Sequence, residues 1–394
     1  MNSKKINLYV ISLIFVLLDF AYAFISKTLL EGTSTVFSLI CFLSFLLIYK
    51  DRKTLSKAGM MLYLFMSWGV LFAYRFDPKW SIIAFVRYLP LLTLFMLKPN
   101  DLKLVRDKLV KSFGLLVFIS LVLYLLKTFG LRILYSGNAS WMQYNIDNYS
   151  YIYTDSLGYE NAFTGFCVES GYFAFLCICL LALTEFDFKN KYSIIFAVGV
   201  LLSMSLEGYL LLVSGTIFYA ASRGKNTKKI ICYTLITIII ISVIVAFAMN
   251  YNGGNNILGE KIFARLAFDK DLGIAGNNRE SSYAEAIIDR VFYSNRVWIG
   301  IGQTEYYNIL AKFNYDICSW RMFVVIYGSI YTIIAFFISL LGLKKTNIRK
   351  TLPFFLIFWM DFYPHGSLSS ESLYILLIIL LLNIRSKVPV PQKA

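Results

Sequence analysis

The stretch WSIIAFVRYLPLLTLFMLKPNDLKLVRDKLVKSFGLLVFISLVLYLLKTFGL, residues 80–131, contains two apolar runs separated by a basic segment. The runs, 80–97 and 112–131, have about the 17 to 25 residues that an α-helix needs to cross the hydrocarbon region of a bilayer. The positive charges of the segment between them are Lys98, Lys103, Arg106, Lys108 and Lys111. Because such charges gather on the cytoplasmic side, the stretch predicts two transmembrane helices joined by a cytoplasmic loop.

The composition of the whole chain also places it in a bilayer. Hydrophobic residues make up 58% of the 394 residues, aromatic residues 17% and charged residues only 15%. This is more apolar surface than one soluble core can bury. Transmembrane β-strands alternate apolar and polar residues, whereas this chain has continuous apolar runs. The sequence therefore predicts an all-α, polytopic integral membrane protein.

The positive charges fall in alternate loops. A net charge of +15 is compatible with nucleic acid or an anionic lipid surface as a partner. Here, however, further basic clusters lie near residues 50–57, 223–229, 344–350 and 385–393. The positive-inside rule places these loops and both termini in the cytoplasm. The charge is thus explained by topology, and nucleic acid is not expected as a partner.

Fitting helices between these loops gives about twelve spans in a single membrane domain, residues 1–394. The first is interpreted as a retained helix and not as a cleaved signal peptide. SMSLEG at 203–208 and YPHG at 363–366 are interpreted as the tips of hairpins. The expected helices are 6–26, 33–49, 58–74, 80–97, 112–131, 163–184, 192–204, 208–222, 229–249, 321–343, 351–362 and 372–385.

This topology leaves two long periplasmic loops, 132–162 and 250–320. Loops of such length are usually either functional or disordered. The first is rich in aromatic and amide side chains, which can stack on sugar faces and hydrogen-bond to hydroxyl groups. The alternative is that it forms an ordered cap on the helix bundle, and composition alone favours neither.

The second loop contains NNRESSYAEAIIDRVFYSNRVWIGIG, residues 277–302. Asn277 and Glu280 resemble a capping box, which predicts an amphipathic helix over 281–292. The arginines on its polar face either bind a ligand or pair with acidic neighbours as on an ordinary solvated helix. The polar face carries Arg279, Tyr283, Ala286 and Arg290, and the apolar face carries Ala284, Ile287, Ile288 and Val291.

The order of three short motifs indicates a family. FCVESG at 166–171 is similar to an FxxEP helix start, and LLSMSLEGYL at 201–210 to an llTxSRgall hairpin. Arg279, the predicted helix and NRVWIGIG at 295–302 follow in the order of an arginine, an amphipathic helix and an hPlfGiG turn. Over 163–328 the chain therefore resembles the Wzy-type O-antigen polymerases and the related ligases. Ser170, Leu206, Glu207 and Arg296 depart from the family's usual residues.

The resemblance implies a GT-C-like glycosyltransferase of the bacterial inner membrane, without cofactor or metal, acting at the periplasmic face. Its substrates would be an undecaprenyl pyrophosphate-linked oligosaccharide donor and acceptor, and a chain-length regulator and a flippase would be partners. Arginine suits a departing pyrophosphate because its planar cation donates several hydrogen bonds. The candidate pyrophosphate ligands are Arg87, Arg265, Arg279 and Arg290. The candidate bases for the attacking hydroxyl are Asp316, Glu169 and His365.

Arg87 and His365 each have a second interpretation. Arg87 lies within the predicted span 80–97, where an arginine is costly unless it pairs or faces a polar cavity. It either binds pyrophosphate or snorkels outward. His365 is the only histidine, and it is either catalytic or structural, without metal-ligand spacing around it. The six cysteines include no CxxC pair, and no disulfide is expected.

Three other functions are alternatives. An O-antigen ligase would carry His-Asn near the position of Asp316, so the sequence favours a polymerase. A flippase or other transporter of lipid-linked oligosaccharides would spread charges along central helices and have short external loops. A metal-dependent glycosyltransferase would need an acidic pair in the first external loop, and 27–33 has none.

Overall fold

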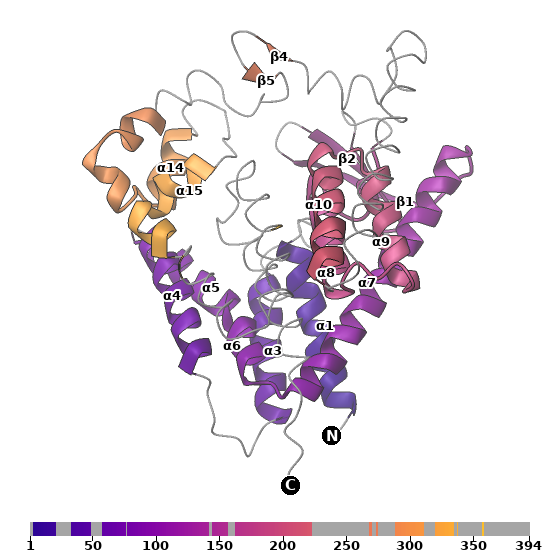
Figure 1. Cartoon of the computed structure of the whole chain (residues 1–394), viewed down its shortest axis with the longest axis horizontal. Helices are drawn as coiled ribbons and strands as arrows, with labels where there is room; N and C mark the ends of the chain where they lie inside the picture. The colour runs from indigo at the N-terminus through magenta and orange to yellow at the C-terminus, as the bar shows by residue number, and fades with distance from the viewer. Residues whose placement is uncertain are drawn as a thin grey trace. The chain divides into compact units, whose positions relative to one another are not determined.

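The computed structural model describes residues 3–20, 33–48, 57–75, 77–141, 144–156, 162–222, 268–269, 273–274, 288–310, 320–334, 337 and 357. These residues are mostly α-helical (Figure 1). The chain forms two compact units. The first comprises Met1–Leu115, Ser282–Thr346 and Asp361–Ala394, and the second comprises Leu116–Ser281 and Asn347–Met360.

Two helical stretches of the described chain are long and apolar enough to cross a membrane. They are Pro78–Met96, of 19 residues, and Asn100–Thr128, of 29 residues. The other apolar helices of this part are shorter. One of them, α9 (Lys191–Leu202), has 12 residues, which at 1.5 Å per residue is about 18 Å. The described structure therefore agrees with the helical class and with membrane association.

The N-terminal half of the first unit contains several helices that pack against α3. α1 (Ser3–Phe20) lies along α3 (Thr33–Ile48), and α5 (Pro78–Arg87) and α6 (Leu89–Met96) contact both α3 and α4 (Lys57–Ala73). Hydroxyl groups join these apolar helices. Tyr9 Oη and Thr93 Oγ1 are 2.8 Å apart, and Ser38 Oγ donates to the carbonyl of Arg87 at 3.3 Å. The N-terminal and central helices thus share one core.

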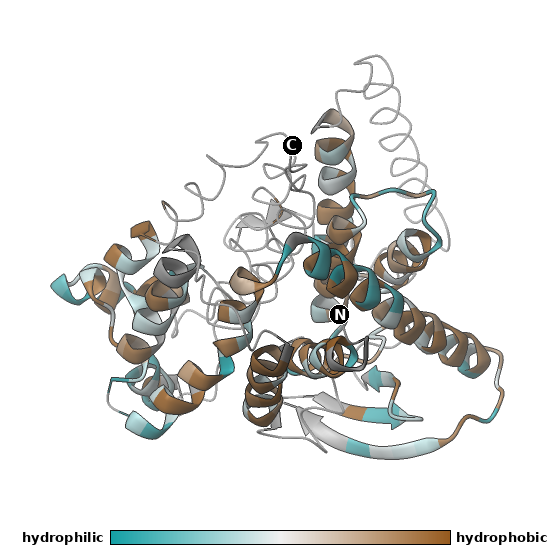
Figure 2. Ribbon diagram, turned by 90° about the horizontal axis from the view of Figure 1, so that it is seen from below, coloured by the Kyte–Doolittle hydropathy of each residue, from teal (hydrophilic) through white to brown (hydrophobic). Residues whose placement is uncertain are grey.

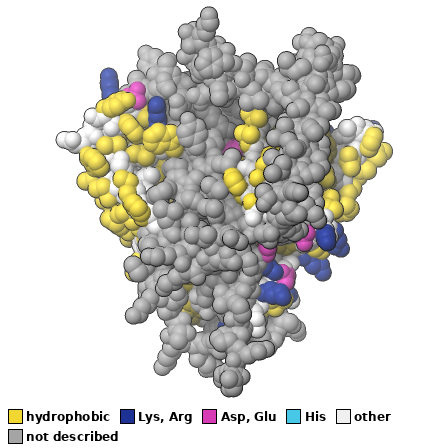
Figure 3. All heavy atoms as spheres, in the orientation of Figure 1, with side chains coloured by type: hydrophobic (Ala, Val, Ile, Leu, Met, Phe, Trp, Pro, Cys, Tyr) yellow, Lys and Arg dark blue, Asp and Glu magenta, His cyan; other side chains and the backbone are white. Residues whose placement is uncertain are grey.

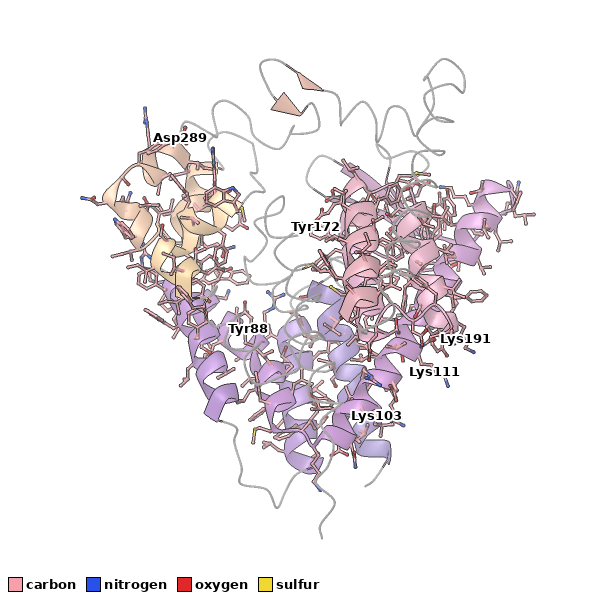
Figure 4. All side chains as sticks on the ribbon, viewed as in Figure 1. Tyr88, Lys103, Lys111, Tyr172, Lys191 and Asp289 are labelled. Atoms are coloured by element: carbon pink, nitrogen blue, oxygen red, sulfur yellow. The ribbon has the colours of Figure 1, made fainter. Side chains whose placement is uncertain are left out.

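The expected helix 80–97 is divided into α5 and α6 at Tyr88. Pro90 explains the division, because its ring has no N–H and clashes with the carbonyl one turn earlier. Tyr88 is buried at the break, and it is labelled in Figure 4. At the other end of α5, Asp77 caps the helix by accepting a hydrogen bond from the Trp80 N–H at 3.2 Å.

The basic segment after residue 97 is helical and is not a loop. α7 extends over Pro99–Thr128 and begins well before the expected residue 112. Pro99 suits the first turn of a helix. The residues Leu102, Val105, Leu109 and Phe113 recur at helical spacing and are fully buried. The lysines lie on the other face (Lys103 and Lys111 in Figure 4), while the second half of α7 is apolar (Figure 2).

The C-terminal part of the first unit contains η3 (Asn295–Trp298), α14 (Gln303–Leu310) and α15 (Trp320–Tyr327). Residues 288–292, the described end of the expected amphipathic helix, are helical. Ile288 and Val291 are buried and Arg290 is exposed, so the predicted division of faces is confirmed there. The prediction of one continuous helix over 321–343 is wrong at Gly328, whose φ of +86° interrupts the helix after Tyr327.

The second unit contains three packed helices, α8 (Ser170–Leu183), α9 and α10 (Leu206–Ser222). The separation of α9 from α10 at 203–205 confirms the predicted turn between two helices. Gly208 allows close packing, since a Cβ there would lie 2.8 Å from the Ala174 Cβ of α8. α8 begins seven residues after the expected position 163, because 162–169 form an irregular buried segment.

A three-stranded antiparallel sheet precedes α8 in the second unit, and the all-α prediction did not include it. Its strands are β1 (Tyr135–Trp141), β2 (Tyr144–Tyr149) and β3 (Tyr153–Ser156), in the order β1-β2-β3. β1 and β2 pair from Tyr135 with Tyr149 to Trp141 with Tyr144. A second sheet has two short strands, β4 (Phe268–Asp269) and β5 (Gly273–Ile274). The expected helices 229–249, 351–362 and 372–385 lie outside the described residues, apart from residue 357.

Candidate functional site

Two backbone segments cross at three glycines in the first unit, and the end of α4 lies against them. We call Gly300, Gly302 and Gly328 the glycine crossing. The N–H of Ile301 donates to the Val325 carbonyl at 2.8 Å, and the N–H of Gly302 donates to the Ile326 carbonyl at 3.1 Å. All three glycines have positive φ, which side-chain-bearing residues rarely adopt.

No side chain fits at the glycine crossing. A Cβ on Gly300 would lie 2.4 Å from the Ile326 carbonyl oxygen, and one on Gly328 would lie 2.5 Å from the Trp298 carbonyl oxygen. A Cβ on Gly302 would lie 2.9 Å from the carbonyl oxygen of Ala73, the last residue of α4. The predicted Gly-x-Gly turn therefore joins three parts of the first unit by backbone contact.

Arg75 holds the glycine crossing to the end of α4. Its Nη2 donates to the Gly300 carbonyl at 3.0 Å, and its Nη1 donates to the Phe72 carbonyl at 3.3 Å. The guanidinium also lies over the Phe72 ring, 4.6 Å from its centroid. Burial lowers the pKa of Arg75, the carboxylate of Glu305 opposes this, and the positive charge of Arg296 adds to it. The charge itself remains, since guanidinium stays protonated in proteins.

Arg296 and Glu305 form an ion pair across the same turn. Arg296 Nη1 and Glu305 Oε1 are 3.0 Å apart, and the side chains are 59% and 32% exposed. The Gly300 N–H donates to the Arg296 carbonyl at 2.7 Å, while the Gly300 carbonyl accepts from Arg75. Gly300 thus contacts the guanidinium of Arg75 and the backbone of Arg296, and the charges of Arg296 and Glu305 both act on the pKa of Arg75. We call Arg75, Arg296 and Glu305 the Arg75 cluster.

Further charged side chains lie in the same unit. Arg321, at the start of α15, is 3.9 Å from Asp289 of the helical segment 288–292. Phe292 of that segment packs edge-on against Trp320 at 5.7 Å. Figure 3 shows basic and acidic side chains beside one another over a hydrophobic surface in this part of the molecule, and Figure 4 labels Asp289. The exposed Arg290 adjoins Asp289, so this surface also combines both charge signs.

The predicted pyrophosphate ligand Arg87 forms an ion pair with Asp19 of α1. Their side chains are 20% and 6% exposed. Pairing of this kind reduces the cost of an arginine in an apolar helix, so α5 carries Arg87 as one half of an ion pair. Asp19 was absent from the predicted site residues. A carboxylate inside the first apolar run was the sequence signal that could have identified it.

Glu169 is the predicted base that lies in the second unit. It is the N-cap residue of α8, its side chain makes no capping hydrogen bond, and it is half-buried. The positive end of a helix dipole favours a carboxylate at this position. The preceding segment is fixed by Thr154 of β3, whose Oγ1 lies 2.8 Å from Thr164 Oγ1 and donates to the Cys167 carbonyl. Glu169 therefore follows a buried segment that is held by side-chain hydrogen bonds.

The tyrosines of the sheet belong largely to a packed aromatic cluster. Tyr153 lies 5.8 Å from Tyr149 and 6.1 Å from Phe163 between ring centroids. Burial of Tyr153, together with the charge of Asp155, raises the pKa of its phenol. Lys127 pairs with Asp155 and lies 4.4 Å above the Tyr149 ring. These contacts pack part of the first long loop against α7, and its binding of sugars stays a prediction.

The other predicted site residues, Arg265, Arg279, Asp316 and His365, lie outside the described part of the chain. Within that part, no group of three or more His, Cys, Asp or Glu side chains is placed to hold a metal ion. The described cysteines, Cys41, Cys167, Cys177 and Cys179, are buried free thiols.

Comparison with known proteins gives no relative. No family model, no curated protein and no solved structure matches this chain.

Proposed function

We propose that this protein is a Wzy-type polymerase of polysaccharide repeat units. In this proposal about twelve helices span the bacterial inner membrane, with both termini in the cytoplasm and the active site at the periplasmic face. The observation that carries it is the Arg75 cluster. Arg296 belongs to the turn and Arg75 donates to the Gly300 carbonyl of that turn, and the turn lies in the segment whose sequence resembles the polymerase motif.

The proposed reaction is a glycosyl transfer. The hydroxyl oxygen of a lipid-linked acceptor attacks the anomeric carbon of the donor glycan and forms the new glycosidic bond. The bond from that carbon to the pyrophosphate oxygen breaks, and its electron pair leaves with undecaprenyl pyrophosphate. Because negative charge develops on the leaving group, guanidinium groups stabilise the transition state by hydrogen bonding and charge.

A base must accept the proton of the attacking hydroxyl, since a sugar hydroxyl is a poor nucleophile. Glu169 supports this role by its half-buried carboxylate and its fixed backbone. Asp316 and His365 remain the other predicted bases. Replacement of each by its uncharged isostere or by alanine distinguishes them, because only loss of the base lowers the turnover number while leaving donor binding unchanged.

Deletion of the gene in the parent bacterium, with complementation, tests the polymerase. Gel separation of lipopolysaccharide should show core carrying a single repeat unit in the deletion strain and the full ladder after complementation. Bare core with polymer retained on undecaprenyl pyrophosphate would instead identify the alternative, an O-antigen ligase acting on lipid A core. An unchanged ladder would refute both functions.

Single substitutions test the arginines. Arg87→Lys, which keeps a cation beside Asp19, Arg279→Ala and Arg290→Ala should each shorten or abolish the ladder at normal abundance in the membrane. Arg132→Ala is the matched control, because Arg132 is an exposed arginine of the second unit outside the proposed site. If the ladder persists in the three variants, pyrophosphate binding by these residues is wrong even when deletion abolishes the ladder.

A further inference from the structure

The Arg75 cluster combines one fixed and one exposed guanidinium. Arg75 donates hydrogen bonds to two backbone carbonyls and stacks over a phenyl ring, so its position is determined by the fold. Arg296, in contrast, is 59% exposed and is paired with a carboxylate that is itself 32% exposed. Exposed ion pairs of this kind are weak because solvent screens them. The pair is therefore easily exchanged for a stronger anion.

Gly300 links the side chain of Arg75 to the backbone of Arg296, and the positive charge of Arg296 acts on Arg75. Gly300 accepts from Arg75 through its carbonyl and donates through its N–H to the carbonyl of Arg296. Gly302 lies against the same side chain, since a Cβ there would be 3.7 Å from Arg75 Cζ. Two guanidinium groups opposed by one carboxylate carry a net positive charge. A phosphate group is the anion whose geometry suits two such planar donors.

We propose that Arg75 and Arg296 together bind the pyrophosphate group of a substrate, and that Glu305 occupies Arg296 until this anion displaces it. The inference rests on the proposed function, because it names residues of the same leaving-group site. It assigns roles to three side chains that the sequence did not single out as ligands. Glu305 is a competitor in this arrangement, so its removal strengthens anion binding, which is the opposite of the effect expected for a purely structural ion pair.

The test uses the full-length protein in lipid nanodiscs and measures binding by isothermal titration calorimetry. The probes are inorganic pyrophosphate, which tests the group alone, and farnesyl pyrophosphate, which tests the lipid-linked form. Glu305→Gln should tighten binding of inorganic pyrophosphate by about two- to fivefold, the worth of an exposed ion pair. Arg75→Ala should weaken it by at least about tenfold, because hydrogen bonds to a charged group are lost.

Two variants protect the test against loss of folding. Arg75→Lys keeps a cation but not the paired donors, and it should bind pyrophosphate more weakly than the unaltered protein while retaining its unfolding temperature. Arg132→Ala, on the exposed surface of the second unit, should bind as the unaltered protein does. Unchanged or weaker binding by Glu305→Gln overturns the proposal, as does equal loss of binding in Arg132→Ala.

The two probes separate the possible sources of the anion. Tighter binding of farnesyl pyrophosphate supports a lipid-linked ligand, whereas binding of inorganic pyrophosphate alone refutes it. Failure of this site is distinguishable from failure of the polymerase. If Glu305→Gln tightens binding while gene deletion leaves the polysaccharide ladder unchanged, the anion site stands and the polymerase function falls. If deletion abolishes the ladder and Glu305→Gln has no effect on binding, only the site falls.

Discussion

Substitution of Gly300 by alanine tests the glycine crossing directly. The new Cβ would lie 2.4 Å from the carbonyl oxygen of Ile326 and 2.6 Å from the backbone nitrogen of Gly328. Both neighbours are backbone atoms, so a rotamer change cannot relieve the overlap. The two segments would have to separate by at least about 0.6 Å in a close-packed interior.

The size of the effect follows from two contributions. Alanine at a left-handed φ costs about 1–2 kcal/mol, and overpacking typically costs about 1–3 kcal/mol more. Gly130→Ala provides a matched control, because Gly130 has a φ of +74°, against +75° for Gly300, and nothing lies within 4 Å of its Cβ position. The difference between the two variants isolates the overlap from the backbone strain.

Thermal unfolding of the purified protein in detergent measures this difference. Gly300→Ala should unfold at a clearly lower temperature than Gly130→Ala, and its proposed pyrophosphate binding should weaken because the Arg75 contact is disturbed. Equal unfolding temperatures for the two variants would refute the close backbone crossing.

Other contacts give further predictions. Asp19→Asn or Arg87→Ala should destabilise the first unit by about 3–5 kcal/mol, the cost of breaking a buried ion pair. The double variant Asp19→Arg with Arg87→Asp should recover stability, because it restores the pair with its charges exchanged. Size-exclusion profiles in detergent measure the folded fraction, and no recovery would argue against the pair. Thr154→Val should cost about 1–3 kcal/mol because the buried Cys167 carbonyl loses its hydroxyl donor, whereas Thr128→Val, at an exposed hydroxyl, should cost less in the same thermal assay. Lys127→Met should cost at most about 1 kcal/mol, and a loss that does not shrink at high salt would contradict an electrostatic origin.

Local patterns in the sequence predicted the helices well. Apolar runs located α1, α3, α4, α9 and α10 to within a few residues, and residues 21–26 of the first expected helix lie outside the described part of the chain. The buried positions of Ile288 and Val291 followed from helical spacing. The same reasoning treated the basic segment before residue 112 as a loop, because charge was taken as a sign of topology. The apolar residues at every third or fourth position of that segment are the buried face of α7, and its lysines lie on the exposed face of the same helix.

The sequence by itself determined the helical, apolar character of this protein and the position of the Gly-x-Gly turn, because hydrophobic periodicity and glycine act over a few residues. Only the tertiary structure decided the partners of the charged groups. Arg87 meets Asp19 across 68 residues, and Arg75 meets Gly300 across 225. Such pairs depend on how helices pack against one another, and packing brings together residues that no local pattern relates.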